Sequence, residues 1–165
     1  MEERARILIV EPNKTNLSVL ARRLSAAGFR VAMAENGAAA VAELHRVPVD
    51  LVLAELNMGP MSGAELARLI RGTAQWRDLP IMLITGRSAP KGAVLAYEAG
   101  ADDVILKPFH FEVLLARIER RIARLRAVEE LVQDNAALDA RVVERAIQIG
   151  ELKEQLAQAR TTARP

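Results

Sequence analysis

The stretch VDLVLAELNM, residues 49–58, contains an apolar run that ends at the carboxylate of Glu55. A run of this kind is typical of a strand that is buried on both faces, as at the centre of a parallel sheet. The turn formers NMGPMSG, residues 57–63, follow it and lead into a helical stretch. Because sites in open α/β sheets lie outside the carboxyl ends of the strands, we expect Glu55 at the functional edge of the fold.

The composition narrows the classes of protein to which the chain can belong. Its 165 residues are 51% hydrophobic, which supports one ordinary domain with an appendage. The absence of cysteine excludes disulfides and thiolate metal sites, and two histidines are too few for most metal clusters. The net charge of +2 argues against a general attraction to nucleic acid. No apolar run reaches the roughly 18 residues that span a bilayer, and the first residues do not resemble a signal peptide, so we expect a soluble, cytoplasmic protein without a membrane contact.

Strand and helix patterns alternate along the chain. Strand patterns occupy residues 6–10, 29–34, 49–55, 80–85 and 104–106. Helical patterns occupy residues 14–27, 37–45, 62–72, about 90–100 and 111 to about 159. This alternation predicts an α/β fold with a parallel sheet that has helices on both faces. We predict a globular domain at 1–122, a coiled-coil dimerisation helix at 123–160 and a disordered tail at 161–165.

Several polar side chains stand where the predicted strands end. Glu11 follows the first strand with Pro12 beside it, Glu55 ends the third, Thr85 the fourth and Lys107 the fifth. Because the carboxyl ends of parallel strands meet at one edge of a sheet, we expect these side chains to share one site.

The motifs around these positions resemble the receiver domain of two-component response regulators. They are ILIVEPNKTN, DLVLAELNMGPMSG, PIMLITG, AGADD and ILKPF, in family order and spacing, and the resemblance covers residues 4 to about 120. It implies a flavodoxin-like, doubly wound, five-stranded parallel sheet. It also implies a site where acids after the first strand and an aspartate ending the third bind Mg²⁺. In the family a histidine kinase phosphorylates that aspartate, and a Ser/Thr and a Lys stabilise the phosphoryl group.

The sequence departs from the family pattern at the positions that this phosphorylation chemistry requires. Glu55 replaces the phosphorylated aspartate, Pro12 replaces one acid of the metal-binding pair and Glu11 the other. Mg²⁺ requires near-octahedral oxygen ligands at short distances, and Pro12 offers no side-chain oxygen. The extra methylene of Glu55 moves its carboxylate by about 1 Å, which in-line phosphoryl transfer does not tolerate. We therefore predict a degenerate pocket with no metal, no cofactor and no enzymatic activity.

The predicted pocket retains groups that can bond to one another. It comprises Glu11, Pro12, Glu55, Asn57, Thr85 and Lys107. Lys107 can form an ion pair with Glu55, and Thr85 can donate a hydrogen bond to it. Glu55 then either mimics the phosphorylated state or forms a vestigial ion pair. Val104 occupies the position of the family's aromatic switch residue, which favours a fixed state.

A heptad pattern in the last helix predicts a coiled coil. With Val128 at position a, the apolar seam and its polar member are Val128, Leu131, Asn135, Leu138, Val142, Ile149, Leu152 and Leu156. β-Branched residues at a with Leu at d favour two parallel strands, and an Asn at a sets register and dimeric state. Against this stand Arg145 at d and the repulsive Asp134–Asp139 pair, so both parallel and antiparallel pairing remain open. The stretch LDARVVERAIQIGELKEQL also resembles the helical linkers that join receivers to output domains such as cyclic-di-GMP phosphodiesterases.

An arginine-rich stripe precedes this seam. It consists of Arg117, Arg120, Arg121, Arg124 and Arg126. The stripe is expected to be a solvated face that pairs with Glu119, Glu129 and Glu130. The alternative is a contact with nucleic acid, although no groove-reading module accompanies it. Trp76, the single tryptophan, lies in a polar loop and is either a packing residue or a partner contact.

Together these features predict a non-phosphorylatable pseudo-receiver that acts as a signalling adaptor. We expect a homodimer that docks onto a kinase, a cyclase or a scaffold protein, with the face of the fourth and fifth helices as the contact. One alternative is a response regulator that is still phosphorylated on Glu55 or on another acid. A second is a DNA-associated regulator that uses the arginine stripe.

Overall fold

The computed structural model describes residues 4–86 and 90–162. The chain divides into two compact units, Met1–Ala123 and Arg124–Pro165, and each is described by itself. In the described part of the chain, none of the helices combines the length and apolarity that crossing a membrane requires.

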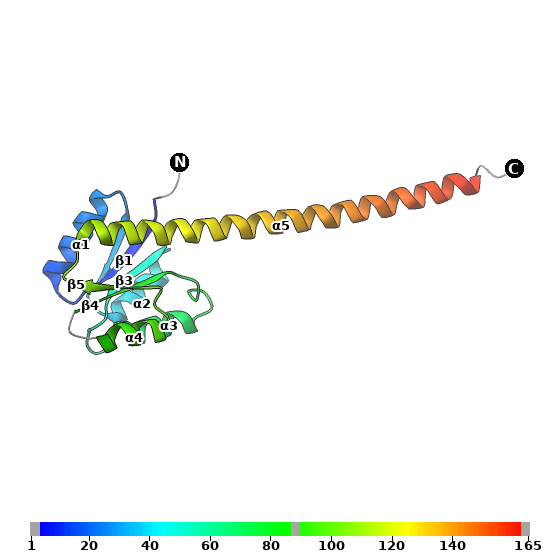
Figure 1. Cartoon of the computed structure of the whole chain (residues 1–165). Helices are drawn as coiled ribbons and strands as arrows, with labels where there is room; N and C mark the ends of the chain where they lie inside the picture. Colours follow the sequence, from blue (N-terminus) through cyan, green and yellow to red (C-terminus); the bar gives the residue numbers. More distant parts are fainter. Residues whose placement is uncertain (1–3, 87–89, 163–165) are drawn as a thin grey trace. The chain divides into compact units, whose positions relative to one another are not determined.

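The first unit contains a five-stranded parallel sheet (Figure 1). Its strands are β1 (Arg6–Val10), β2 (Arg30–Ala34), β3 (Leu51–Glu55), β4 (Ile81–Gly86) and β5 (Asp103–Lys107). Their order across the sheet is β2-β1-β3-β4-β5. The apolar run of residues 49–58 thus forms a central strand, and every residue of β3 is buried. This arrangement confirms the predicted fold class.

A helix follows each strand, and the first three helices begin at polar caps. They are α1 (Lys14–Ala26), α2 (Gly37–Arg46), α3 (Gly63–Gly72), α4 (Pro90–Glu98) and α5 (Phe111–Thr162). The side chains of Asn13, Asn36 and Ser62 accept hydrogen bonds from the first-turn N–H groups of α1, α2 and α3. After α1 the chain turns at Gly28 with φ +96°, a left-handed conformation that favours glycine. Local sequence signals therefore set the ends of these elements.

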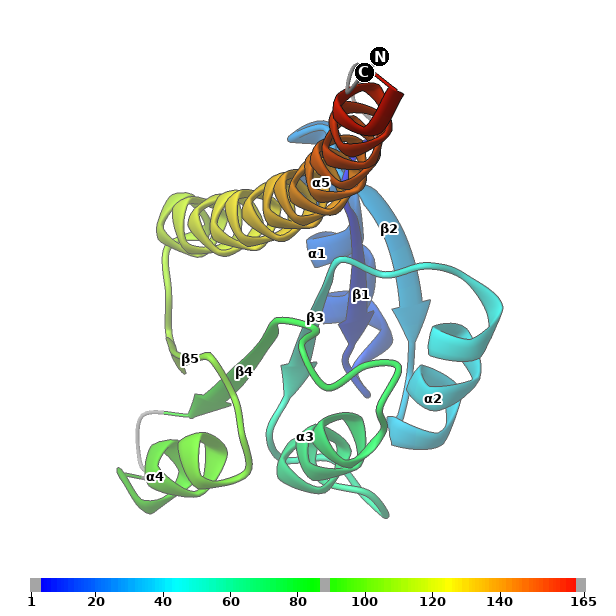
Figure 2. The ribbon, with the colours of Figure 1, turned by 90° about the vertical axis from the view of Figure 1, so that its right-hand side faces the viewer.

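Two apolar layers enclose the sheet because successive strand side chains point to opposite faces. Ile7 and Ile9 of β1 pack with residues of α1 and of the first turns of α5, such as Leu24 and Ile118. Leu8 and Val10 pack against the opposite layer, which contains α2, α3 and α4. Figure 2 shows these three helices on the same side of the strands. The doubly covered sheet leaves its carboxyl edge as the place where polar side chains gather.

The second unit is helical. Helix α5 continues through it to Thr162, so the first two residues of the predicted tail, Thr161 and Thr162, are helical. The remaining tail residues, 163–165, lie outside the described residues. Every residue from 126 to 160 is exposed.

Candidate functional site at the carboxyl edge of the sheet

Four strands bring the predicted polar residues to one edge of the sheet. Glu11 directly follows β1, Glu55 ends β3, Thr85 lies near the end of β4 and Lys107 ends β5. Neighbouring strands are in register across this edge, with Glu55 opposite Ile84 and Thr85 opposite Leu106.

Lys107 lies between two buried carboxylates. Its Nζ is 2.5 Å from Oε2 of Glu55 and 3.7 Å from Oε2 of Glu11. Glu11 and Glu55 are 5% and 8% exposed, whereas the side chain of Lys107 is 39% exposed. The ammonium group thus reaches the acids from the solvent side and neutralises one of their two negative charges.

Backbone N–H groups bind the remaining oxygens of both acids. Oε1 of Glu11 accepts from the N–H of Asn13 at 2.9 Å, and Oε1 of Glu55 accepts from the N–H of Asn57 at 3.3 Å. The side chain of Asn57 is exposed, so this predicted pocket residue contributes through its backbone. Both carboxylates are held within the protein's own hydrogen-bond network.

The protonation of Lys107 reflects opposing influences. Burial is the largest of them and by itself lowers the pKa of Lys107, whereas the hydrogen bond and charge of Glu55, and then those of Glu11, raise it. The acids prevail, and the pKa lies above the usual value for lysine. Lys107 is therefore charged at neutral pH, and its ion pair with Glu55 is maintained.

Thr85 has no partner in this network. Its side chain is fully buried, and its Oγ1 has no hydrogen bond within the described residues. The predicted donation from Thr85 to Glu55 is therefore absent, and the oxygens of that carboxylate bond instead to Lys107 and to the N–H of Asn57. Thr85 is thus a buried donor without an acceptor. Leaving such a hydroxyl unpaired lowers the stability of the folded protein by about 1–3 kcal/mol.

Few side-chain oxygens at this site are available to bind a divalent cation. Pro12 is exposed and has no side-chain oxygen, and Glu55 is already bonded to Lys107. Among residues 4–86 and 90–162, no group of three or more His, Cys, Asp or Glu side chains is placed to hold a metal ion.

Close packing below the site positions Glu55. The N–H of Gly63, the first residue of α3, donates to the carbonyl of Leu56 at 2.8 Å. A Cβ atom at position 63 would lie 2.5 Å from the carbonyl oxygen of Glu55. The capping box of Ser62 and Glu65 holds the start of the same helix. Helix α3 thus abuts the end of β3, and the loop between them is held at both ends.

Val104 is buried on β5 and packs in the layer that contains α2, α3 and α4. Leu106, two residues later, is 47% exposed. The predicted switch position therefore carries an aliphatic core side chain.

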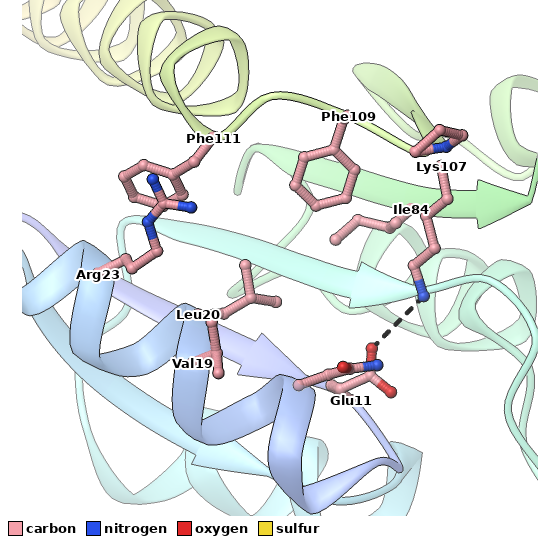
Figure 3. Close-up of a pocket in the computed structure, with 10 residues that line it drawn as sticks. Glu11, Val19, Leu20, Arg23, Ile84, Lys107, Phe109 and Phe111 are labelled. Carbon is pink, nitrogen blue, oxygen red and sulfur yellow. Dashed lines mark ion pairs between the residues drawn. The ribbon is translucent and has the colours of Figure 1, made fainter.

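A cavity of about 520 Å³ adjoins the ion pair of Lys107 and Glu11 (Figure 3). It lies between α1 and the connection from β5 to α5, and its lining includes Glu11 and Lys107 together with Val19, Leu20, Arg23, Ile84, Phe109 and Phe111. The guanidinium carbon of Arg23 lies 4.0 Å from the centre of the Phe111 ring. Sequence reasoning missed this cavity. The available signal was Val19, an exposed apolar residue outside the Leu17, Leu20 and Leu24 stripe of α1.

The arginine stripe is partly engaged within the first unit. Arg117 donates to Oδ1 of Asp103 at 3.1 Å and to the carbonyl of Val104, and Arg121 donates to the carbonyl of Asp102. These partners lie at the start of β5 and differ from the predicted Glu119, Glu129 and Glu130. Bonds to the domain's own backbone reduce what the stripe can offer to a phosphate chain.

Trp76 is a packing residue. It is 7% exposed, and its ring meets that of His45 edge to face with 4.7 Å between the ring centres. The contact joins α2 to the loop between α3 and β4.

The predicted seam residues all lie in the second unit and are exposed there. Val128, Leu131, Leu138, Val142, Ile149, Leu152 and Leu156 expose between 51% and 68% of their surface. Asn135 is likewise exposed. The single chain thus leaves the whole seam open to solvent.

Known proteins resemble the first unit in sequence and structure. The sequence model of the response regulator receiver domain family matches residues 7–119 of this chain. Response regulator MprA of Mycobacterium tuberculosis is 35% identical over 119 residues, which are 72% of this chain and 51% of that protein. The receiver domain of a signal transduction histidine kinase from Syntrophus aciditrophicus aligns with a TM-score of 0.68 and 34% identity, covering 72% of this chain and 90% of that one.

One relative extends the similarity into the second unit. A probable cyclic di-GMP phosphodiesterase of Vibrio cholerae is 29% identical over 148 residues, which are 90% of this chain and 33% of that protein. The chain therefore spans a third of this relative and about half of MprA.

Proposed function

This chain belongs to the response regulator receiver-domain family of two-component signalling, and we propose that it is a pseudo-receiver that signals by docking, without phosphorylation. The observation that carries the proposal is the ion pair of Lys107 and Glu55, with 2.5 Å between Nζ and Oε2. The ammonium group of Lys107 lies against the carboxylate, so a phosphoryl group or a metal ion could bind there only if Lys107 moved away. The protein is then held in one state.

The chemistry of the donor set supports the loss of Mg²⁺. An octahedral ion needs several oxygens at about 2.0–2.1 Å, and Pro12 supplies none from its side chain. Glu11 and Glu55 are each one methylene longer than aspartate, and both are bonded to Lys107. Their carboxylates would have to leave that cation before they could bind another.

Homodimerisation through the second unit is the next part of the proposal. The exposed seam that begins at Val128 and Leu131 follows the a/d spacing of a two-stranded coil. Asn135 at an a position favours a dimer with one register. Pairing would remove seven large apolar side chains of each chain from water, which stabilises the dimer relative to the isolated helix.

Docking onto a protein partner completes the proposal. Apolar side chains are exposed on α4, on β5 and at the start of α5: Val94, Leu95, Tyr97, Leu106 and Val113. Exposed apolar side chains on neighbouring elements are typical of a protein interface. The partner is a signalling kinase, cyclase or scaffold protein.

Thr85 favours a second candidate, a regulator that still accepts a phosphoryl group on Glu55. Its buried, unpaired hydroxyl could donate to an oxygen of a bound group. In that case Lys107 would have to exchange Glu55 for the phosphoryl oxygens.

One experiment separates the two candidates. The chain is treated with Mg²⁺ and either acetyl phosphate or beryllofluoride, and adducts are sought by mass spectrometry and NMR. We expect no Mg²⁺-dependent adduct. The matched control combines Glu11→Asp, Pro12→Asp and Glu55→Asp, which restores short carboxylates at all three positions and should gain Mg²⁺ binding. An adduct on Glu55 of the unaltered chain would establish the second candidate.

A further inference from the structure

The second unit exposes more apolar side chains than the heptad seam accounts for. Val132, Val143 and Ile147 are 62%, 59% and 57% exposed and occupy neither a nor d positions. With two alanines they recur at intervals of four, four, three and four residues, the spacing of one helix face. We name this face the second stripe: Val132, Ala136, Ala140, Val143 and Ile147.

The second stripe lies far around the helix from the seam. At about 100° per residue, its centre is about 140° from the centre of the seam. In a two-stranded coil that face remains in water, where polar side chains are expected. The stripe is therefore not explained by the dimer that we propose.

Charges are divided between the two faces. The charged side chains that border the second stripe between residues 129 and 154 are all acidic: Glu129, Asp139, Glu144, Glu151 and Glu154. The bases of the same stretch are Arg141, Arg145 and Lys153, which hold heptad positions g, d and e beside the seam. The second stripe is thus an apolar strip with an acidic border, and it is chemically distinct from the seam.

We propose that the second stripe binds an amphipathic helix of a partner protein whose apolar face is bordered by Lys and Arg. Opposite charges at such borders favour pairing, and like charges oppose it. A second copy of this chain would place acids against acids in either orientation, so self-pairing through this stripe is disfavoured. This inference rests on the proposed dimer, which leaves the stripe uncovered.

The test uses the full chain and synthetic helical peptides with leucines along one face. One peptide carries Lys at both borders of that face, and its counterpart carries Glu. We expect the Lys peptide to bind and the Glu peptide to bind at least tenfold more weakly. Replacing Val143→Ser together with Ile147→Ser should weaken binding of the Lys peptide by about tenfold or more, because buried apolar area is lost. Asp139→Asn with Glu144→Gln should weaken it and reduce its salt dependence.

Controls separate this inference from the proposed dimer. Gln148→Ser with Gln155→Ser changes the same helix outside both faces and should leave binding unchanged. The V143S/I147S chain should keep the sedimentation mass of the unaltered chain. Equal binding of the two peptides, undiminished binding to V143S/I147S, or a changed mass of that variant would overturn the inference. If the unaltered chain is a monomer, the dimer proposal fails, while the peptide comparison still decides the role of the stripe.

Discussion

At the residue scale, the sequence predicted which groups meet at the carboxyl edge but not all of their bonds. Lys107 and Glu55 were expected to pair because parallel strands end together, and opposite charges at that edge attract. The unpaired Thr85 was not predictable, because a hydrogen bond depends on the distance and direction between donor and acceptor. A residue pattern places both groups at one edge of the sheet but does not state that distance.

Replacing Lys107→Met should destabilise the first unit, because it leaves two buried carboxylates close together without a cation. We expect a loss of about 1–3 kcal/mol at pH 7, less than for a fully buried pair because the lysine is partly exposed. Urea unfolding measures this loss, with the exposed Lys91→Met as the control.

The same substitution has a definite pH dependence. Folding raises the pKa of Lys107, so the charged lysine stabilises the folded state. This contribution to the free energy of unfolding is complete when the pH is below the pKa of Lys107 in the unfolded chain, and it is lost as the pH rises through the pKa in the folded chain. The stability difference between the unaltered chain and K107M should therefore be constant near neutral pH and shrink in the alkaline range. A difference that shrinks on acidification and persists at alkaline pH would contradict the proposed role of the lysine.

Gly63→Ala should also destabilise the first unit. The new Cβ would meet the Glu55 carbonyl oxygen at 2.5 Å, and neither backbone segment can move freely. We expect a loss of about 1–3 kcal/mol, typical of overpacking. Gly72→Ala is the matched control in the same helix, because it has no neighbouring atom within 4 Å. Equal thermal stability of the two variants would show that α3 can retreat from β3.

At the element scale, apolar spacing and turn-forming residues predicted where most helices and strands lie. In the structure, Asn13 and Ser62 cap the starts of α1 and α3, and Gly28 follows the end of α1. The order of the strands is different in kind, because periodicity predicts a parallel sheet but does not state which strands are neighbours. Resemblance to the receiver family implied a doubly wound sheet, and the structure gives the order β2-β1-β3-β4-β5. The long-range bonds that lock the loops were invisible in the sequence.

Arg71 illustrates such a bond and allows a test. Its guanidinium group donates to the carbonyls of Gly100 and Leu79 and to Oδ2 of Asp102, at 2.9, 2.7 and 2.7 Å. It thus joins the end of α3 to the loops before β4 and β5. Arg71→Lys keeps the charge but removes the planar fork, so we expect a loss of about 1–3 kcal/mol. Arg68→Lys, an exposed change in the same helix, should be neutral, and denaturant midpoints compare the two.

At the whole-molecule scale, the two units of the chain differ in how they bury their apolar side chains. The first unit has a complete core in its two layers, and its fold follows from the chain alone. The second unit leaves its apolar side chains exposed, which is why we propose that contacts with other molecules cover them. The heptad pattern predicted the seam, whereas Val132, Val143 and Ile147 lie outside its a and d positions and the pattern does not account for them.

The last prediction concerns the oligomeric state. Isolated helices gain little stability in water, and most of it comes from packing an apolar face. Placing a charge in the seam should therefore separate the chains, and we expect Leu138→Lys with Val142→Lys to reduce the sedimentation mass from dimer to monomer. The matched control is Val143→Ser, which changes the residue next to Val142 but lies outside the seam. This variant should remain a dimer. The Asn135→Val variant should form a more stable assembly with mixed register or stoichiometry, because a buried amide at an a position lowers stability while it disfavours the alternative arrangements. If L138K/V142K keeps the mass of the unaltered chain, or that chain is itself a monomer at high micromolar concentration, residues 128–156 do not form the interface.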